Sequence, residues 1–186
     1  MFIQTEQTPN PATLKFLPGR IVMASGTANF TDADLAARIS PLAERLFALP
    51  QVTGVFFGTD FITVTKAAEG DWHRLKPAVL AVIMEHFTAA RPVMLAGAAD
   101  GAITEVCQED EDEVVSQIKE LLETRVRPAV AQDGGDIIFH DYEEGVVYLH
   151  MQGSCSGCPS STATLKAGIE NMLRHYIPEV VEVRAV

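Results

Sequence analysis

The order of apolar and polar residues in the first half of the chain predicts two β-hairpins. In residues 12–23, ATLKFLPGRIVM, apolar runs lie on both sides of Pro18 and Gly19, which predicts two short strands around a turn. Residues 52–66, VTGVFFGTDFITVTK, are rich in β-branched and aromatic side chains and predict a second hairpin that turns at residues 58–60.

Two amphipathic helices are expected beside these hairpins. Thr31 or Asp32 is placed to cap the first helix and Pro50 to stop it, while Asp71 opens the second, and the elements of this half end near Arg91. Each helix has one apolar face, because its apolar residues recur at helical spacing. These residues are Leu35, Ile39, Leu42, Leu46 and Phe47 in the first helix and Leu75, Val79, Val82, Ile83 and Phe87 in the second.

The second half of the chain begins with a segment that lacks periodicity. Residues 97–112 are largely Gly, Ala and acidic residues, a composition typical of a linker. Residues 114–126 then predict a helix with a kink at Pro128, which Gly134 and Gly135 end. Next, DIIFHDYEEGVVYLHMQ predicts a hairpin that turns at Glu143 to Gly145, LKAGIENMLRHY predicts a helix, and VVEVRAV predicts a last strand.

This order of elements predicts an α+β fold class with two small mixed domains joined by an acidic flexible linker. We expect a first domain at residues 1–95, a linker at 96–110 and a second domain at 111–186.

Composition and charge narrow the classes of partner. The chain is 47% hydrophobic with a formal net charge of -11, and residues 101–186 hold 16 acidic and 6 basic residues. Such an acidic surface repels phosphate backbones and anionic lipids, so we expect no nucleic acid and no membrane as partners. The first residues, MFIQTEQTPNPATLKFLPG, resemble neither a secretory signal nor a transit peptide, which predicts a cytoplasmic protein.

The segment QGSCSGCPSS carries the candidate chemistry of the chain. Cys155 and Cys158 are separated by a Ser and by Gly157, which permits a tight turn that points both sulfur atoms at one metal. Pro159 suits the first position of a helix, so the helix N-terminus is expected to lower the pKa of the thiols.

Two thiolates do not complete a site that needs four protein ligands, such as tetrahedral zinc or a four-iron cluster. A second copy of the chain is the simplest source of the missing pair, because a two-fold axis brings two identical pairs together. A site divided between two subunits can open, which suits a donor of its cargo better than a permanent electron carrier.

The segments RPAVAQDGGDI and LHMQGSCSGCPSSTATLKAGIENML closely resemble the C-terminal cluster-binding domain of the NifU-like (Nfu) family. FIQTEQTPNPATLKFLPG, GVFFGTDFITVTK and DWHRLKP are similar to the N-terminal domain of the same family. The resemblance implies a non-enzymatic scaffold or carrier that binds a 4Fe-4S cluster, or also a 2Fe-2S form, through Cys155 and Cys158.

The same resemblance implies three kinds of partner: a second copy of the chain in a cluster-bridged homodimer, apo iron–sulfur client proteins, and upstream cluster-assembly proteins. The first domain is expected to recognise clients or donors. Because family members in mitochondria carry a presequence that is not seen here, a bacterial protein is the simpler reading, with a trimmed mitochondrial matrix form as the alternative.

Other readings of the cysteine pair stay open on the sequence. A thiol–disulfide oxidoreductase also uses a C-x-x-C at a helix N-terminus, and a zinc-bridged dimer needs the same ligand count. Cys107 in the acidic segment is interpreted as a thiol outside the site. His140 and His150 could reach the motif but are interpreted as surface strand residues, and Asp133 and Asp136 are too few for a calcium loop.

Overall fold

The computed structural model describes residues 2–96, 113–156 and 159–186, without the side chains of residues 159–161. The chain divides into two compact units, Met1–Thr104 and Glu105–Val186, here called unit 1 and unit 2. Each mixes helices with strands, which confirms the predicted α+β class. The expected linker at 96–110 lies almost wholly outside the described residues, so its boundaries stay a prediction.

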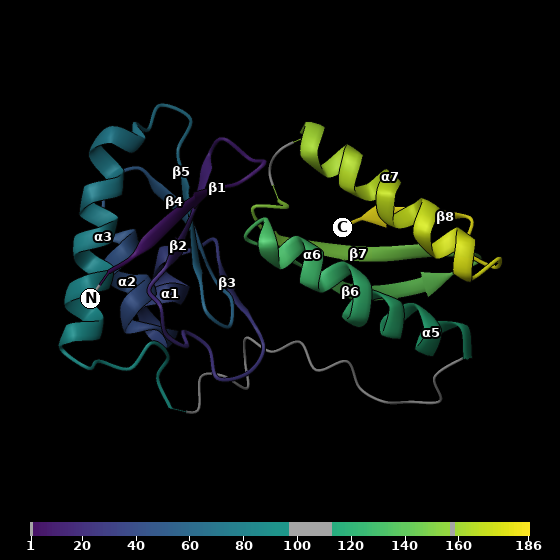
Figure 1. Ribbon diagram of the computed structural model, residues 1–186, viewed down its shortest axis with the longest axis horizontal. Coiled ribbons are helices and arrows are strands. Elements are labelled where there is room, and N and C mark those ends of the chain that lie inside the picture. The colour runs from purple at the N-terminus through teal and green to yellow at the C-terminus, as the bar shows by residue number, and fades with distance from the viewer. Residues whose placement is uncertain (1, 97–112, 157–158) are drawn as a thin grey trace. The chain divides into compact units, whose positions relative to one another are not determined.

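Unit 1 is an antiparallel five-stranded sheet with helices on one face (Figure 1). The strands lie in the order β1-β2-β5-β4-β3: β1 (Gln4–Gln7), β2 (Thr13–Leu17), β5 (Ile62–Lys66), β4 (Val52–Phe57) and β3 (Ala28–Phe30). The helices are α1 (Ala33–Ile39), α2 (Pro41–Phe47) and α3 (Trp72–Thr88). Their apolar sides and the covered sheet face form one core that includes Phe16, Phe57, Leu42 and Ile83.

Several local predictions for unit 1 are confirmed. The hairpin of β4 and β5 turns at residues 58–60. Asp32 caps α1 by accepting hydrogen bonds from the N–H groups of Asp34 and Leu35, and Asp71 caps α3 by accepting one from His73. Short-range capping and turn chemistry therefore act here as the sequence indicates.

The hairpin expected around Pro18 and Gly19 is wrong. Strand β2 pairs instead with β1 and β5, and the residues after Gly19 form a loop. Val22 and Met23 are apolar because this loop enters the core, where the Val22 N–H donates to the Thr59 carbonyl at 2.7 Å. The apolar run that resembles a strand is therefore an irregular segment whose apolar residues are buried in the core.

The single helix expected before Pro50 is two helices. The chain turns at Ser40, which ends α1 and whose side chain accepts a hydrogen bond from the Ala43 N–H, so that it caps α2. Pro41 at the first position of α2 has no N–H to continue the hydrogen-bond ladder of α1. The break lets two short apolar faces meet the same sheet.

Unit 2 has a three-stranded sheet in the order β6-β7-β8, with helices packed on it. Strands β6 (Gly135–Glu143) and β7 (Val146–Gly153) form the predicted hairpin, and β8 (Glu182–Ala185) pairs parallel to β7. Glu144 and Gly145 both have positive φ, as a tight two-residue turn requires. The helical segments are α5 (Glu113–Leu121), a π-helical turn η1 (Leu122–Val126), α6 (Arg127–Gln132) and α7 (Pro159–Tyr176).

The kink predicted at Pro128 takes the form of the π-helical turn η1. Pro128 has no N–H to donate to the preceding turn, and η1 directly precedes α6, in which Pro128 lies. The apolar residues of this helical region still share one buried face with the sheet, among them Ile118, Leu122, Val126 and Val130.

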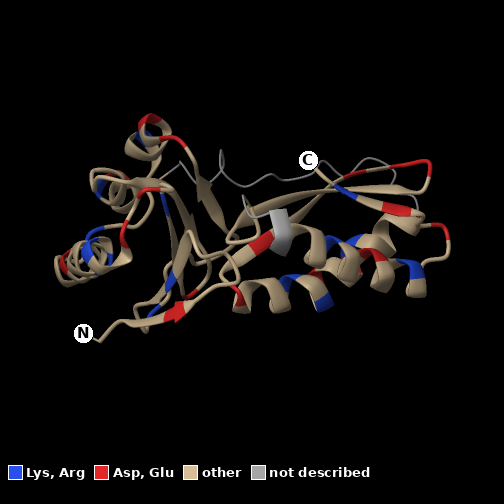
Figure 2. Ribbon diagram, turned by 90° about the horizontal axis from the view of Figure 1, so that it is seen from above, with Lys and Arg blue, Asp and Glu red and all other residues tan. Residues whose placement is uncertain are grey.

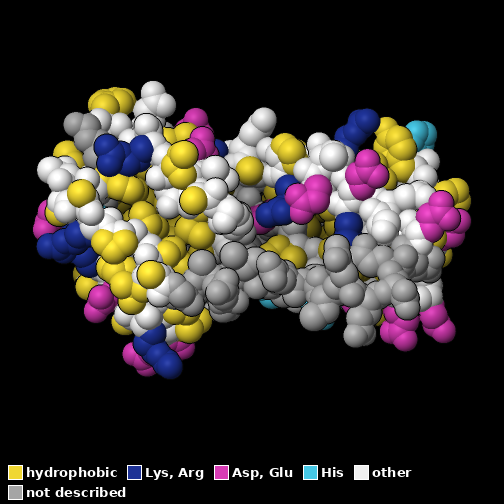
Figure 3. All heavy atoms as spheres, turned by 90° about the horizontal axis from the view of Figure 1, so that it is seen from below, with side chains coloured by type: hydrophobic (Ala, Val, Ile, Leu, Met, Phe, Trp, Pro, Cys, Tyr) yellow, Lys and Arg dark blue, Asp and Glu magenta, His cyan; other side chains and the backbone are white. Residues whose placement is uncertain are grey.

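The surfaces of the two units differ in character. Lys and Arg alternate with Asp and Glu along the helices of unit 2 (Figure 2). On one face of unit 1, hydrophobic side chains gather, with both basic and acidic side chains around them (Figure 3). Within the described segments, we find no helix with the length and hydropathy that crossing a bilayer requires.

Candidate functional site

Cys155 lies in the short loop that leads from β7 to α7. Gly153 ends β7 with a φ of 63°, a conformation that favours glycine, and the chain turns there. The helix α7 begins at Pro159, which confirms the predicted start. Cys155 is only 5% exposed and belongs to the core of unit 2 together with Met151.

A second turn, at Gly134 and Gly135, packs against this loop. The Ser154 N–H donates to the Gly134 carbonyl at 3.2 Å, and the Ser154 hydroxyl donates to the Asp133 carbonyl at 2.5 Å. A Cβ atom at position 135 would lie 2.4 Å from the Cys155 Sγ atom, so the glycine leaves the space that the sulfur occupies. The turn at Gly134 and Gly135 thus packs directly against the loop that carries Cys155, although the two are distant in sequence.

One hydrogen bond joins the cysteine loop to α7, and another closes the loop itself. The Thr162 hydroxyl donates to the Cys155 carbonyl at 3.0 Å, and the Ser156 hydroxyl donates to the Gly153 carbonyl at 2.9 Å. The backbone of Cys155 is therefore held at the start of the helix by a side chain of that helix.

An ion pair braces the turn on its other side. The Arg127 guanidinium donates to both carboxylate oxygens of Asp136, through Nε and Nη2, at 2.8 Å each. Asp136 is 3% exposed, and its Oδ1 atom also accepts the Ile137 N–H at 2.8 Å. These hydrogen bonds raise the pKa of Arg127 above its usual range, with Glu123 as a second acidic partner. The pair connects α6 to the strand that begins beside Cys155.

The Cys155 thiol does not have the lowered pKa that the helix N-terminus predicted. Burial raises its pKa to about 11, and the negative charges of Asp133 and Asp136 act in the same direction, while a hydrogen bond with Ser154 opposes them. At neutral pH Cys155 is a protonated thiol in an apolar setting. A metal that binds it must displace the proton.

The structure describes only part of the predicted site. Cys158 and Cys107 lie outside the described residues. His140 and His150 are exposed on β6 and β7, as expected for surface strand residues. Across the described residues, no three or more His, Cys, Asp or Glu side chains are grouped to hold a metal ion.

Asp136 forms an ion pair with Arg127, and Gly134 follows the helix with a φ of 81°, which agrees with the helix-ending interpretation of this segment. The roles of Arg127, Ser154 and Thr162 were not predicted. The only signal for the ion pair is an arginine at the start of RPAVAQDGGDI and an aspartate after its two glycines.

Family comparisons match both halves of the chain. Residues 3–90 match the family described as "Scaffold protein Nfu/NifU N terminal", and residues 118–184 match the "NifU-like domain". The proteins named NFU1 iron-sulfur cluster scaffold homolog, mitochondrial, are 55% identical in Drosophila grimshawi and 54% identical in Drosophila virilis, and each alignment includes 100% of this chain. The chain spans 61% and 62% of the length of these two relatives.

One solved structure, the solution structure of a NifU-like protein from Saccharomyces cerevisiae, is 25% identical to the chain with a TM-score of 0.47. The match covers 52% of this chain and 86% of that one.

The expectation of a bacterial cytoplasmic protein is wrong, since the relatives are named mitochondrial and point to a mitochondrial protein. The prediction rested on the first residues of the chain, which cannot decide targeting when the relatives are so much longer. With the two domain matches following each other along one sequence that is more than half identical to these relatives, the chain belongs to the NifU-like (Nfu) family and contains both the Nfu N-terminal domain and the NifU-like domain.

Proposed function

We propose that this protein is a non-enzymatic scaffold or carrier that holds an iron–sulfur cluster as cargo through Cys155 and Cys158. The observation that carries the proposal is the loop of Cys155, held between the Gly134 turn and the start of α7, with a second cysteine three positions further along the chain. The relatives are named iron–sulfur cluster scaffolds, which supports the same role.

The cluster is proposed to be 4Fe-4S, or also 2Fe-2S, shared between two copies of the chain. Both cluster types take four protein ligands, and each chain supplies two thiolates. Two chains related by a two-fold axis therefore complete one site. Among the described residues, no group of three or more His, Cys, Asp or Glu side chains offers a metal site within one chain.

Delivery to apo-proteins proceeds by exchange of ligands. A client thiolate replaces one cysteine thiolate of the carrier at each iron, so the iron–sulfur core keeps its charge and no oxidant or reductant is needed. A site made from two loosely joined subunits opens during this exchange. Cys155 and Cys158 then take up protons from solvent as they are released.

Unit 1 is proposed to recognise clients and upstream cluster-assembly proteins, and unit 2 to hold the cargo. The proposed boundaries are residues 1–95, 96–110 and 111–186. Separate core clusters in the two units support independent folding, because each buries its own apolar residues.

Anaerobic reconstitution with iron and sulfide tests the shared site. We expect a brown protein with about two irons and two sulfides per chain that runs as a dimer and returns to a smaller species when a chelator removes the iron. Native mass spectrometry and size-exclusion chromatography measure both properties. A monomer with four irons would contradict the shared site. The 3 cysteines of one chain are too few to supply the four ligands of such a cluster.

The anaerobically reconstituted protein also distinguishes the proposed carrier from two rival functions. A colourless protein whose cysteine pair forms a reversible disulfide would favour a thiol–disulfide oxidoreductase, and a colourless protein with bound zinc would favour a structural dimer. Catalytic C-x-x-C thiols have a lowered pKa, whereas burial raises the pKa of Cys155, so the first of these rivals gains no support from the described site.

A further inference from the structure

Strand β1 forms one edge of the sheet of unit 1. It pairs with β2, and in the described part of the chain no strand pairs with its outer side. Figures 1 and 2 show it as the strand that leaves the N-terminus along the margin of the sheet. Alternate N–H and C=O groups of an edge strand point away from the sheet and can pair with another extended segment.

Two hollows adjoin this edge, one on each face of the sheet. Thr5 and Gln7 pair with the core residues Phe16 and Leu14 and so share the helix-bearing face. They line a hollow of about 700 Å³ together with Trp72, His73 and Lys76, here called the α3 hollow. The other hollow, of about 550 Å³, is lined by Phe2, Gln4, Leu17, Arg20, Ile21 and Asp60 and is here called the Phe2 hollow.

The α3 hollow suits a carboxylate. Lys76 contributes a cationic group and His73 an imidazole ring, and none of the described residues that line it is an Asp or Glu. The Trp72 Nε1 atom donates to the Pro11 carbonyl at 3.3 Å, which connects the start of α3 to the β1–β2 loop. An acidic side chain bound here would meet positive charge beside an aromatic ring.

The Phe2 hollow suits an apolar side chain. Phe2 is 80% exposed and Ile21 is 68% exposed, the largest values among the exposed large hydrophobic residues. Arg20 and Asp60 supply opposite charges to its lining, so no single charge dominates it. Exposed apolar side chains grouped at a hollow are typical of a contact surface.

We propose that β1 accepts an extended segment of a partner protein as an additional strand, with an acidic side chain in the α3 hollow and an apolar side chain in the Phe2 hollow. Side chains of a strand alternate between faces, so the two anchors lie an odd number of residues apart. If the apolar anchor lies opposite Gln4 and the acidic anchor opposite Gln7, the two anchors are three residues apart in the partner segment. The inference rests on the proposed function, in that the partner is the client or donor assigned to unit 1.

Synthetic ten-residue peptides of Thr and Val test this surface on the full chain. They carry one Leu and one Glu three residues apart, in either order, so that parallel and antiparallel pairing are both sampled. The sequence contains a single tryptophan, Trp72, which lines the α3 hollow. Its fluorescence therefore reports occupation of this hollow. We expect saturable binding by one of the two orders, together with slower amide exchange in residues 4–7.

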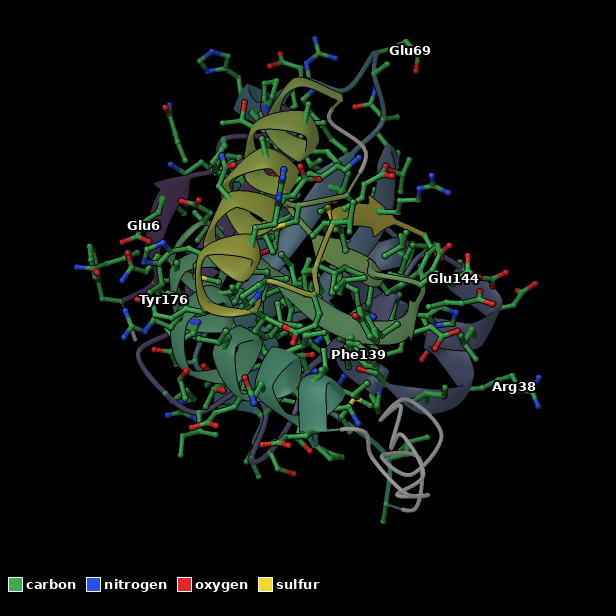
Figure 4. All side chains as sticks on the ribbon, turned by 90° about the vertical axis from the view of Figure 1, so that its right-hand side faces the viewer. Glu6, Arg38, Glu69, Phe139, Glu144 and Tyr176 are labelled. Atoms are coloured by element: carbon green, nitrogen blue, oxygen red, sulfur yellow. The ribbon has the colours of Figure 1, made fainter. Side chains whose placement is uncertain are left out.

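A charge exchange tests the acidic anchor. Lys76→Glu should weaken binding of the Glu peptide at least tenfold and should strengthen binding of the peptide that has Lys in place of Glu. Arg38→Glu is the matched control and should change neither affinity, because Arg38 lies on α1 at the opposite side of unit 1 from Glu6 of β1 (Figure 4). Of the two peptides N-methylated at one or the other set of alternate residues, the one that lacks the N–H groups facing β1 should not bind, because it cannot complete the ladder.

Absence of saturable binding would overturn the inference, as would binding that neither Lys76→Glu nor N-methylation weakens. Iron content of the reconstituted wild type and Lys76→Glu proteins separates this failure from failure of the proposed function. If both load about two irons per chain and no peptide binds, the docking surface alone is wrong. If neither protein loads iron, the carrier function is wrong whatever the peptides do.

Discussion

The backbone of Gly135 lies so close to Cys155 that a Cβ atom at position 135 would be 2.4 Å from the cysteine Sγ atom and 2.9 Å from the Gln152 carbonyl oxygen. No side chain larger than that of glycine fits without moving either the cysteine loop or the start of β6. The position of the thiol in unit 2 therefore depends on a residue from a different loop.

Gly135→Ala should lower the free energy of unfolding of unit 2 by about 1–3 kcal/mol, because overpacking a closed site forces a backbone shift. The shift moves Cys155, so we also expect less iron per chain after anaerobic reconstitution. Urea unfolding followed by circular dichroism and a colorimetric iron assay measure the two effects.

Gly168→Ala is the matched control for this change. Gly168 lies in α7, and a Cβ atom there would meet nothing within 4 Å. The substitution should stabilise unit 2 by about 0.5–1 kcal/mol through helix propensity, with unchanged iron content. Equal losses of iron in both variants would show that the close approach at Gly135 does not position the cysteine.

Arg127→Leu should destabilise unit 2 by about 3–5 kcal/mol, because it removes the bidentate partner of a buried carboxylate. Asp136 keeps the Ile137 N–H but loses both guanidinium contacts. Glu123→Gln removes only the more exposed partner of the same arginine and should cost at most about 1 kcal/mol. Chemical unfolding of the two variants, compared with the wild type, tests this order, and similar losses would contradict it.

Cys155→Ala and Cys158→Ala should each abolish a stable cluster, because each change removes two of the four ligands from a symmetric pair. Absorbance of anaerobically reconstituted protein measures the cluster, and circular dichroism checks that the fold is kept. Cys107→Ala serves as the control and should load normally. Loss of the cluster in the Cys107 variant, with retention in the other two, would reverse the assignment of ligands.

His86 should make unit 1 less stable as the pH falls below about 6.5. It is fully buried, and its Nε2 atom lies 3.1 Å from the Pro92 carbonyl. Burial lowers its pKa, and Arg45 and Arg91 add to this effect. The unfolded chain therefore takes up a proton that the folded one excludes, so stability is complete above the unfolded pKa and declines below it, by at most about 1.4 kcal/mol per pH unit.

Urea unfolding followed by Trp72 fluorescence at about pH 7.5 and pH 5.5 measures this dependence. His86→Gln should remove most of the difference between the two pH values. His73→Gln, an exposed histidine of the same helix, should leave it unchanged. A wild-type protein with equal stability at the two pH values would refute the role of His86.

Much of the local structure follows from the sequence alone. The Asp71 cap of α3, the turn at 58–60 and the start of α7 at Pro159 are all formed as predicted. Each depends on residues close together in the chain, whose hydrogen bonds and backbone preferences act within one or two turns. The cysteine pair and its shortage of ligands are likewise visible without coordinates.

Only the tertiary structure decides the surroundings of these elements. The pairing of β2 with β1 and β5, and the ion pair of Arg127 with Asp136, join segments that periodicity treats separately. The pKa of Cys155 was predicted in the wrong direction, because the helix N-terminus is a local feature, whereas desolvation and the charges of Asp133 and Asp136 come from the packing of another loop. Sequence patterns report which side of an element is buried; what that side is buried against, and with which charges, depends on contacts between distant residues.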